Sequence, residues 1–182
     1  QQKGVVHRPA AYWHNLARWT AVRALKNPGW VFIIDADEIP DGALVLEWLL
    51  HISDALDARN CYKIATYWYF KAATNRAQML EDSILLMHSS HLTEKNIFGD
   101  YERDYLIAAS KCKLIRQVKG VDGVVLWNHY SWVRPRSELI HKIQNWGHSS
   151  DMFKNVDAVK LVDYIFRNND VNDVVHGYAY IT

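Results

Sequence analysis

Helical patterns of apolar and polar positions occur in four stretches of the chain, namely residues 12–26, 43–52, 137–146 and 157–166. In the first stretch, apolar side chains recur every three or four residues, which is the spacing of one face of a helix. Asn27-Pro28-Gly29 follows, and such a trio ends a helix because proline and glycine disfavour its continuation. We therefore predict four helices, with Ser137 as the N-cap of the third.

Other apolar stretches predict strands, namely residues 30–34, 61–70, 111–118 and 124–132. The first, WVFII, is a continuous apolar run without alternation, which is typical of a strand buried on both faces of a sheet. A turn is expected at Asp122-Gly123 and another at residues 39–42, whereas residues 71–110 give no clear pattern. Helices that alternate with buried strands favour an α/β fold.

The composition is that of one folded domain. Of the 182 residues, 49% are hydrophobic and 23% charged, so disorder is not expected and a single domain accounts for residues 1–182. With 21 basic and 20 acidic residues the net charge is +1, which gives no general attraction for nucleic acid or an anionic membrane. No apolar run reaches the roughly 18 residues that span a bilayer, so we expect peripheral membrane contact at most.

The two cysteines indicate the cellular compartment in which the protein is expected. Cys61 and Cys112 stand far apart in the sequence and lack metal-ligand spacing. This pattern favours buried thiols in a reducing compartment, and hence a cytoplasmic protein, with a single disulfide as the alternative.

Three carboxylates follow the first predicted strand directly: Asp35, Asp37 and Glu38. In open α/β sheets, ligands bind beyond the carboxyl ends of the strands. Three carboxylates within four residues repel one another, and a divalent cation removes that repulsion. Hard oxygen ligands suit Mg²⁺ or Mn²⁺, which in turn bridge the phosphate oxygens of a nucleotide. The alternative is an acidic turn that lies in solvent.

Two segments resemble family-2-type glycosyltransferases. In LARWTAVRALKNPGWVFIIDADEIPDG, Ala17-Arg18 matches an alanine-arginine pair that opens a helix in the family, and a hydrophobic strand leads into the aspartate-any-aspartate motif at residues 35–37. The later segment WNHYSWVRPRSELIHKIQNWGH is similar to one in bacterial members of this group. There, histidine-tyrosine-serine-tryptophan ends a strand and a basic helix follows. Together the two segments span about 50 residues.

The resemblance implies a GT-A fold, a three-layer sandwich with a mostly parallel central sheet. It also implies that Asp35 and Asp37 hold a divalent metal against a nucleotide-sugar donor, with His129 completing the metal shell, and that the acceptor is a glycan or other carbohydrate. A GT-A domain places its nucleotide-binding strands before this motif, and only 34 residues precede Asp35. We therefore expect the fold to be incomplete at its N-terminus.

Further residues receive roles from this resemblance. A guanidinium or an ammonium group can neutralise the leaving diphosphate of the donor. The basic residues expected to bind the donor are Arg18, Arg134, Arg136 and Lys142. Trp132 and Trp146 are candidates for stacking on an acceptor sugar, with core packing as the alternative.

An inverting transferase also needs a carboxylate that takes the proton of the acceptor hydroxyl. Asp82, beside Glu81, is the favoured base because a carboxylate doublet before an apolar run resembles the acidic base motif of the family. Asp100, Glu102 and Asp104 remain alternatives.

Two other classes of protein fit parts of the sequence. Haloacid-dehalogenase-type phosphatases also carry a strand that ends in two aspartates, so Asp35 would be the nucleophile and Asp37 the acid. Thr66 and Lys95 would be further site residues, and residues 99–104 resemble the late acidic loop of that family. A non-catalytic glycan-binding domain is the third interpretation, in which aromatic side chains carry the binding. Metal-dependent donor binding, phosphomonoester turnover and metal-independent glycan binding distinguish the three.

Overall fold

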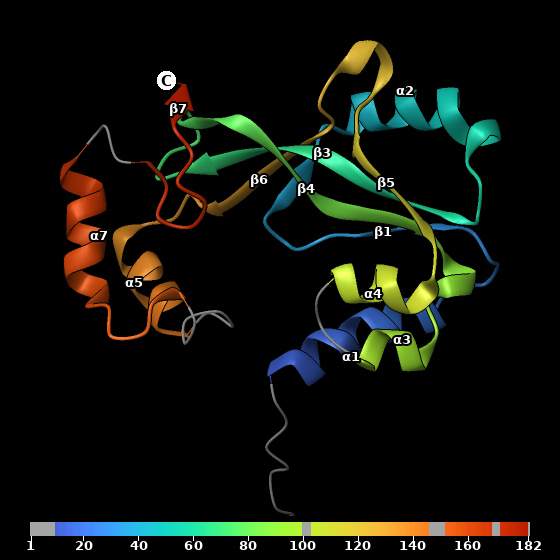
Figure 1. Ribbon diagram of the computed structural model, residues 1–182, viewed down its shortest axis with the longest axis horizontal. Helices are drawn as coiled ribbons and strands as arrows, with labels where there is room; N and C mark the ends of the chain where they lie inside the picture. The colour runs from blue at the N-terminus through green and yellow to red at the C-terminus, as the bar shows by residue number, and fades with distance from the viewer. Residues whose placement is uncertain (1–9, 100–102, 146–151, 169–171, 182) are drawn as a thin grey trace, which may run out of the picture.

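A computed structural model describes residues 10–99, 103–145, 152–168 and 172–181, and these residues form a mixed α/β fold around a curled sheet of seven strands (Figure 1). The strands are β1 (Trp30–Ile33), β2 (Glu38–Pro40), β3 (Asn60–Phe70), β4 (Arg76–His88), β5 (Lys113–Val118), β6 (Trp127–Trp132) and β7 (Tyr180–Ile181). The α-helices are α1 (Ala10–Arg23), α2 (Gly42–Ile52), α3 (Glu94–Gly99), α4 (Arg103–Ser110), α5 (Arg136–Asn145) and α7 (Ala158–Arg167). None of the described helices is long and apolar enough to cross a membrane.

The sheet is mixed in direction. Its main path runs β1-β4-β3-β6-β2, while β5 also pairs with β3 and β7 with β4. The pairs β3–β5 and β3–β6 are parallel, whereas β1–β4, β2–β6, β3–β4 and β4–β7 are antiparallel. The α/β class is thus confirmed, but the mostly parallel sheet expected from the resemblance is not, because antiparallel pairs outnumber parallel ones among the described strands.

Most of the predicted elements are confirmed within a few residues. The four predicted helices correspond to α1, α2, α5 and α7, although α1 ends at Arg23, earlier than expected. The predicted strands correspond to β1, β3, β5 and β6. Two details are wrong. Residues 38–40 form a short strand rather than part of a turn, and Ser137 lies inside the first turn of α5, which begins at Arg136.

Strand β1 lies at one end of the sheet path and still has apolar neighbours on both faces. Trp30 and Phe32 pack on one core cluster, whereas Val31 and Ile33 pack on another. Side chains alternate between the two faces of a strand. The unbroken apolar run WVFI therefore reflects helices on both sides of β1 and not a central position in the sheet.

Three clusters of buried side chains make up the core. The α2 cluster consists of Trp48, Tyr62, Ile64, Ile84, Leu86, Leu126 and Trp127. The α3–α4 cluster consists of Ile33, Cys61, Leu85, Met87, Leu92, Ile97, Leu106 and Ile107. The α5–α7 cluster consists of Trp68, Phe70, Ala77, Trp132, Leu139, Ile143, Phe153, Ala158, Val162 and Ile165. In Figure 1, α2 lies on one side of the sheet, and the helices of the other two clusters lie on the opposite side.

The twist of β3 connects these clusters. Tyr62 and Ile64 contact the α2 cluster, while Trp68 and Phe70, at the same alternate positions of the strand, belong to the α5–α7 cluster. Strands twist progressively along their length. The same face of β3 is therefore turned toward α2 at the start of the strand and toward α5 and α7 at its end. The loop between β1 and β2 runs beneath this twisted region, between the two groups of helices (Figure 1).

Candidate functional site

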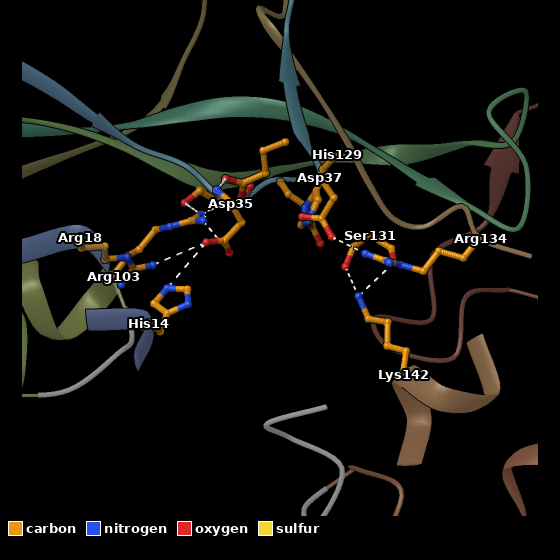
Figure 2. Close-up of polar contacts among 12 residues, drawn as sticks. His14, Arg18, Asp35, Asp37, Arg103, His129, Ser131, Arg134 and Lys142 are labelled. Atoms are coloured by element: carbon orange, nitrogen blue, oxygen red, sulfur yellow. Dashed lines mark hydrogen bonds and ion pairs between the residues drawn. The ribbon is translucent and has the colours of Figure 1, made fainter. Parts of the chain in front are cut away.

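The two aspartates of the DxD motif lie in the short loop between β1 and β2 (Figure 2). The loop is closed on itself, because the backbone N–H of Asp35 donates to the Glu38 carboxylate at 2.7 Å and the N–H of Glu38 donates back to the carbonyl of Asp35 at 3.1 Å. The N–H of Tyr130 on β6 donates to the carbonyl of Asp37 at 2.9 Å. The loop is therefore fixed to β6, the strand that carries His129.

Asp35 is surrounded by basic side chains from two helices. Arg103 of α4 lies 2.8 Å from Oδ2 of Asp35. From α1, Arg18 and His14 lie 3.6 and 3.8 Å from Oδ1. Asp35 itself is 43% exposed, so its carboxylate is held by the protein but still reaches solvent. Figure 2 shows these four side chains together on one side of the site.

A buried ion pair lies directly behind Asp35. The guanidinium of Arg103 donates to both oxygens of Glu38, at 2.7 and 2.9 Å, and to the carbonyl of Ser83. The Glu38 side chain has no exposed surface. The third carboxylate of the acidic trio, Glu38, is therefore a structural partner of Arg103. We do not count it among the candidate metal ligands.

Asp37 points to the other side of the site. Arg134, which follows β6, donates to Oδ2 of Asp37 at 3.1 Å, and Nε2 of His129 lies 3.6 Å from Oδ1. Burial acts to raise the pKa of Asp37, but His129, Lys142 and Arg134 outweigh burial and hold this pKa well below its usual range. Asp37 is therefore a carboxylate at any pH at which the protein is normally studied.

His129 lies between two carboxylates. Its Nε2 faces Asp37 and its Nδ1 lies 3.6 Å from Oε2 of Glu81. Both separations are longer than a hydrogen bond, so these are ionic contacts. Burial acts to lower the pKa of His129, but the two carboxylates outweigh it and raise the pKa to about 9. The imidazole is thus a cation at neutral pH in the metal-free protein.

Lys142 of α5 extends toward the same side of the site (Figure 2). Its Nζ donates to the carbonyl of Ser131 at 2.9 Å and also to the Ser131 hydroxyl. Nε of Arg134 donates to that same carbonyl at 3.0 Å. Burial lowers the pKa of Lys142 to about 8, although Asp37 partly opposes this effect. One carbonyl thereby sets two cationic groups side by side.

An open hollow adjoins these two cations. It has a volume of about 570 Å³ and is lined by Arg134, Ser137, Glu138, His141, Lys142 and Asn145. Most of these side chains can donate a hydrogen bond, and two of them are permanently or largely cationic. Glu138 lies 3.7 Å from Arg134 and offsets part of this charge. The remaining donors and cations give the hollow the chemistry of an anion-binding surface next to Asp37.

Several residues singled out from the sequence lie elsewhere. Asp82 forms an ion pair with Arg116, whose Nη1 donates to both of its oxygens at 3.0 Å. Arg136 binds Asp163 of α7, with an Nε–Oδ1 distance of 2.8 Å. By contrast, five of the residues singled out from the sequence lie around one site with Asp35 and Asp37, namely Arg18, Glu81, His129, Arg134 and Lys142.

The residues proposed for acceptor or phosphatase chemistry have other surroundings. Trp132 is fully buried in the α5–α7 cluster, so its ring packs in the core. Thr66 is fully buried inside β3, and its hydroxyl donates to the carbonyl of Ile64 at 3.0 Å. Asp104 binds the buried Lys63 at 3.1 Å. Trp146, Asp100 and Glu102 lie outside the described residues.

Three partners of the site were not found from the sequence, namely His14, Arg103 and Ser131. His14 lies one helical turn before Arg18 on α1, which is the only sequence signal that could have identified it. Arg103 sits in an acidic run, far from Asp35 in sequence, and only the packing of α4 brings it there. Ser131 acts mainly through its carbonyl, which no residue pattern reveals.

The donor atoms of the site fit a hard divalent cation that takes most of its ligands from a substrate. In the described part of the chain, no group of three or more His, Cys, Asp or Glu side chains is placed to hold a metal ion. However, Mg²⁺ commonly takes only one or two protein carboxylates and completes its shell with phosphates and water. Asp35 and Asp37 are two carboxylates of this kind; Arg103 and Arg134 bind them in this structure, and these cationic groups also suit phosphates.

Comparison with known proteins adds no assignment. Scans of protein-family models, of curated proteins and of solved structures each returned no match to this chain. The geometry and charge of the site are therefore the basis for a functional proposal.

Proposed function

We propose that the chain is the metal-binding, acceptor-side part of a glycosyltransferase of the GT-A type, which moves a sugar from a nucleotide-sugar donor to a glycan or other acceptor. The loop between β1 and β2 is its metal-binding loop. The two thiols, Cys61 and Cys112, are both free, which supports action in the cytoplasm.

The arrangement of charges around the DxD loop carries this proposal. Asp35 and Asp37 lie beneath the sheet, and cationic side chains from α1, α4, α5 and the loop before α5 flank them on both sides (Figure 2). An acidic pair alone would favour a cation, and a basic cluster alone would favour an anion. A divalent metal with a diphosphate satisfies both sets, because the metal neutralises the carboxylates and the basic side chains neutralise the phosphates.

Each residue of the site has a proposed role in binding the metal or the diphosphate. Asp35 and Asp37 hold the metal, which when bound supplies positive charge to the departing diphosphate. Arg18 on one side and Arg134 with Lys142 on the other bind phosphate oxygens, so that developing negative charge meets preorganised donors. Asp82 pairs with Arg116 and not with the residues around Asp35 and Asp37, so it is given no role in this scheme.

The test is metal-dependent donor binding, measured as a shift in thermal unfolding with UDP- and GDP-sugars. Stabilisation is expected only when Mn²⁺ and the right donor are both present, and at a donor concentration 100 times Kd it amounts to about 2.7 kcal/mol. Asp37→Ala abolishes this stabilisation. The matched control is Asp54→Ala, at an exposed aspartate in the turn that follows α2, which keeps it.

The competing classes give different results in the same set of experiments. Turnover of a generic phosphomonoester that is lost in Asp35→Asn would favour a phosphatase. Glycan binding that persists in the double variant Asp35→Ala plus Asp37→Ala would favour a non-catalytic binding domain. Unchanged nucleotide-sugar affinity in Asp37→Ala would refute the transferase.

A further inference from the structure

The C-terminal turn, residues 173–178, is built around one buried carboxylate. The side chain of Asp173 has no exposed surface, and it accepts the backbone N–H groups of Val175, His176 and Tyr178 at 2.9, 2.6 and 2.9 Å. Burial acts to raise the pKa of Asp173, but the His176 contact and these N–H groups outweigh it and lower the pKa. An ionised Asp173 therefore fixes the shape of this turn.

The turn presents His176 in a single orientation. Its Nδ1 lies 3.5 Å from Asp173 and its Nε2 lies 3.1 Å from Oε1 of Glu81. One face of the imidazole stacks on Tyr178, with ring centroids 4.9 Å apart and an interplanar angle of 15°. Trp68 meets the same ring edge to face at 4.7 Å. Contacts on all these sides leave the ring little freedom to rotate.

Glu81 links this turn to the candidate functional site. Its Oε1 faces His176, and its Oε2 lies 3.6 Å from Nδ1 of His129. The far nitrogen of His129 faces Asp37 at 3.6 Å. Trp68 also meets His129 edge to face, with centroids 4.7 Å apart, so a single indole contacts both imidazoles. Carboxylates and imidazoles thus alternate from Asp173 to Asp37.

This alternation controls the direction in which His129 points. The His129 side chain is only 13% exposed, and its Nδ1 has no hydrogen-bond partner of normal length among the described residues. The negative charge of Glu81 is what favours that nitrogen facing inward, which directs Nε2 toward Asp37. Glu81, itself 12% exposed, is held in turn by its shorter contact with His176.

The geometry points to Glu81 and His176 as positioning residues that hold the imidazole of His129 against Asp37. They act on the site through His129, and the C-terminal turn is therefore part of the functional unit. The consequence for donor binding rests on the proposed function. The orientation of His129 is a property of the protein alone, and the test measures both.

The first measurement is the ¹⁵N spectrum of the histidine rings in the metal-free protein at one pH, with the His129 signals identified by their loss in His129→Gln. Glu81→Gln and His176→Ala are expected to shift these signals, because each removes a link that orients the ring. His176→Gln, whose side-chain amide can still donate to Glu81, should restore them. Asp82→Asn is the matched control from the same doublet and should leave them unchanged.

The second measurement is Mn²⁺-dependent donor binding by calorimetry. Loss of groups that orient a ligating shell commonly costs 10-fold or more in affinity. We expect about that loss in Glu81→Gln and His176→Ala, near-wild-type affinity in His176→Gln, and no change in Asp82→Asn. Thermal unfolding of each variant shows that the fold persists, and the half-buried His176 remains a usable position if Glu81→Gln does not fold.

The outcomes separate this inference from the proposed function. Unmoved His129 signals in both Glu81→Gln and His176→Ala would overturn the positioning role, whatever the donor affinity. If these signals move as expected while the wild-type protein binds no nucleotide sugar, the proposed function fails and the positioning role stands.

Discussion

Arg103 joins Glu38 and Asp35 through one guanidinium group. It binds the fully buried Glu38 carboxylate at 2.7 and 2.9 Å and the half-exposed Asp35 carboxylate at 2.8 Å. Burial acts to lower the pKa of Arg103, but these two carboxylates outweigh burial and raise the pKa. The aspartate that faces the site is thereby attached to the interior of the protein.

Breaking this pair should destabilise the protein strongly. Arg103→Met leaves the Glu38 charge buried without its partner, and such a loss typically costs about 3–5 kcal/mol of unfolding free energy. Urea unfolding measures the effect. Arg136→Gln is the control, because the Arg136–Asp163 pair is partly exposed and its loss should cost about 1 kcal/mol or less. Similar losses in both variants would contradict the structural role of Arg103.

Two nearby arginines should differ in donor binding. Arg134 contacts Asp37 and lines the hollow on α5, whereas Arg136 is occupied by Asp163. A hydrogen bond to a charged group contributes about 1.5–3 kcal/mol, so Arg134→Gln should weaken Mn²⁺-dependent donor binding roughly 10-fold or more. Arg136→Gln should leave it unchanged. Calorimetric titration decides, and equal effects would rule out this division of roles.

Anion binding in the hollow should depend on pH through Lys142. Because burial lowers the pKa of Lys142 to about 8, its ammonium is present below that pH and is lost as the pH rises through it. The affinity for sulfate, which remains a dianion throughout, should therefore fall between pH 7 and pH 9. Lys142→Arg should flatten this dependence, because a guanidinium keeps its charge.

Sulfate titration at several pH values checks this expectation. A wild-type affinity that is constant from pH 7 to pH 9, or a fall that persists unchanged in Lys142→Arg, would show that another group governs anion binding.

The thiol of Cys61 should be unreactive in the native protein. Burial, followed by the neighbouring Cys112, raises the pKa of Cys61 to about 11, and Cys61 is fully buried. The thiolate is the reactive form, so iodoacetamide at pH 8 should leave Cys61 unmodified in the native protein and should modify both cysteines in denaturant. Mass spectrometry of the peptides distinguishes the two states. Rapid native modification of Cys61 would contradict its burial.

Helical periodicity predicted helices such as α7, which pack one apolar face. Runs of apolar residues predicted strands such as β1 and β3, which pack on both faces. Strand β4 (Arg76–His88) was not predicted, since its pairing with β3 contains register shifts that interrupt the alternation of side chains. Its first half also carries Glu81 and Asp82, which resemble a loop in composition. Strand direction was beyond the sequence, because pairing is a long-range property.

The site was predictable only where one segment contains it. Asp35 and Asp37 could be singled out because they directly follow a predicted strand, and His129 because it lies in the histidine-tyrosine-serine-tryptophan motif. The sequence favoured Asp82 as the site carboxylate, whereas it is Glu81 that lies beside His129 and Asp82 that pairs with Arg116. Adjacent residues of a strand point to opposite faces, and the sequence does not show which face meets the site. A register shift nearby decides which of them meets His129. Arg103 depends entirely on the packing of α4.

Strand β3 contributes side chains to all three core clusters, with Cys61 in one, Ile64 in the second and Phe70 in the third. Because each cluster includes side chains of β3, none of the three clusters is a hydrophobic core of its own. Loss of β3 would therefore open every part of the core at once. Unfolding should consequently be a single cooperative transition. A cut within β3 should yield two pieces that cannot fold separately, and fusion partners or split reporters belong in the surface loops.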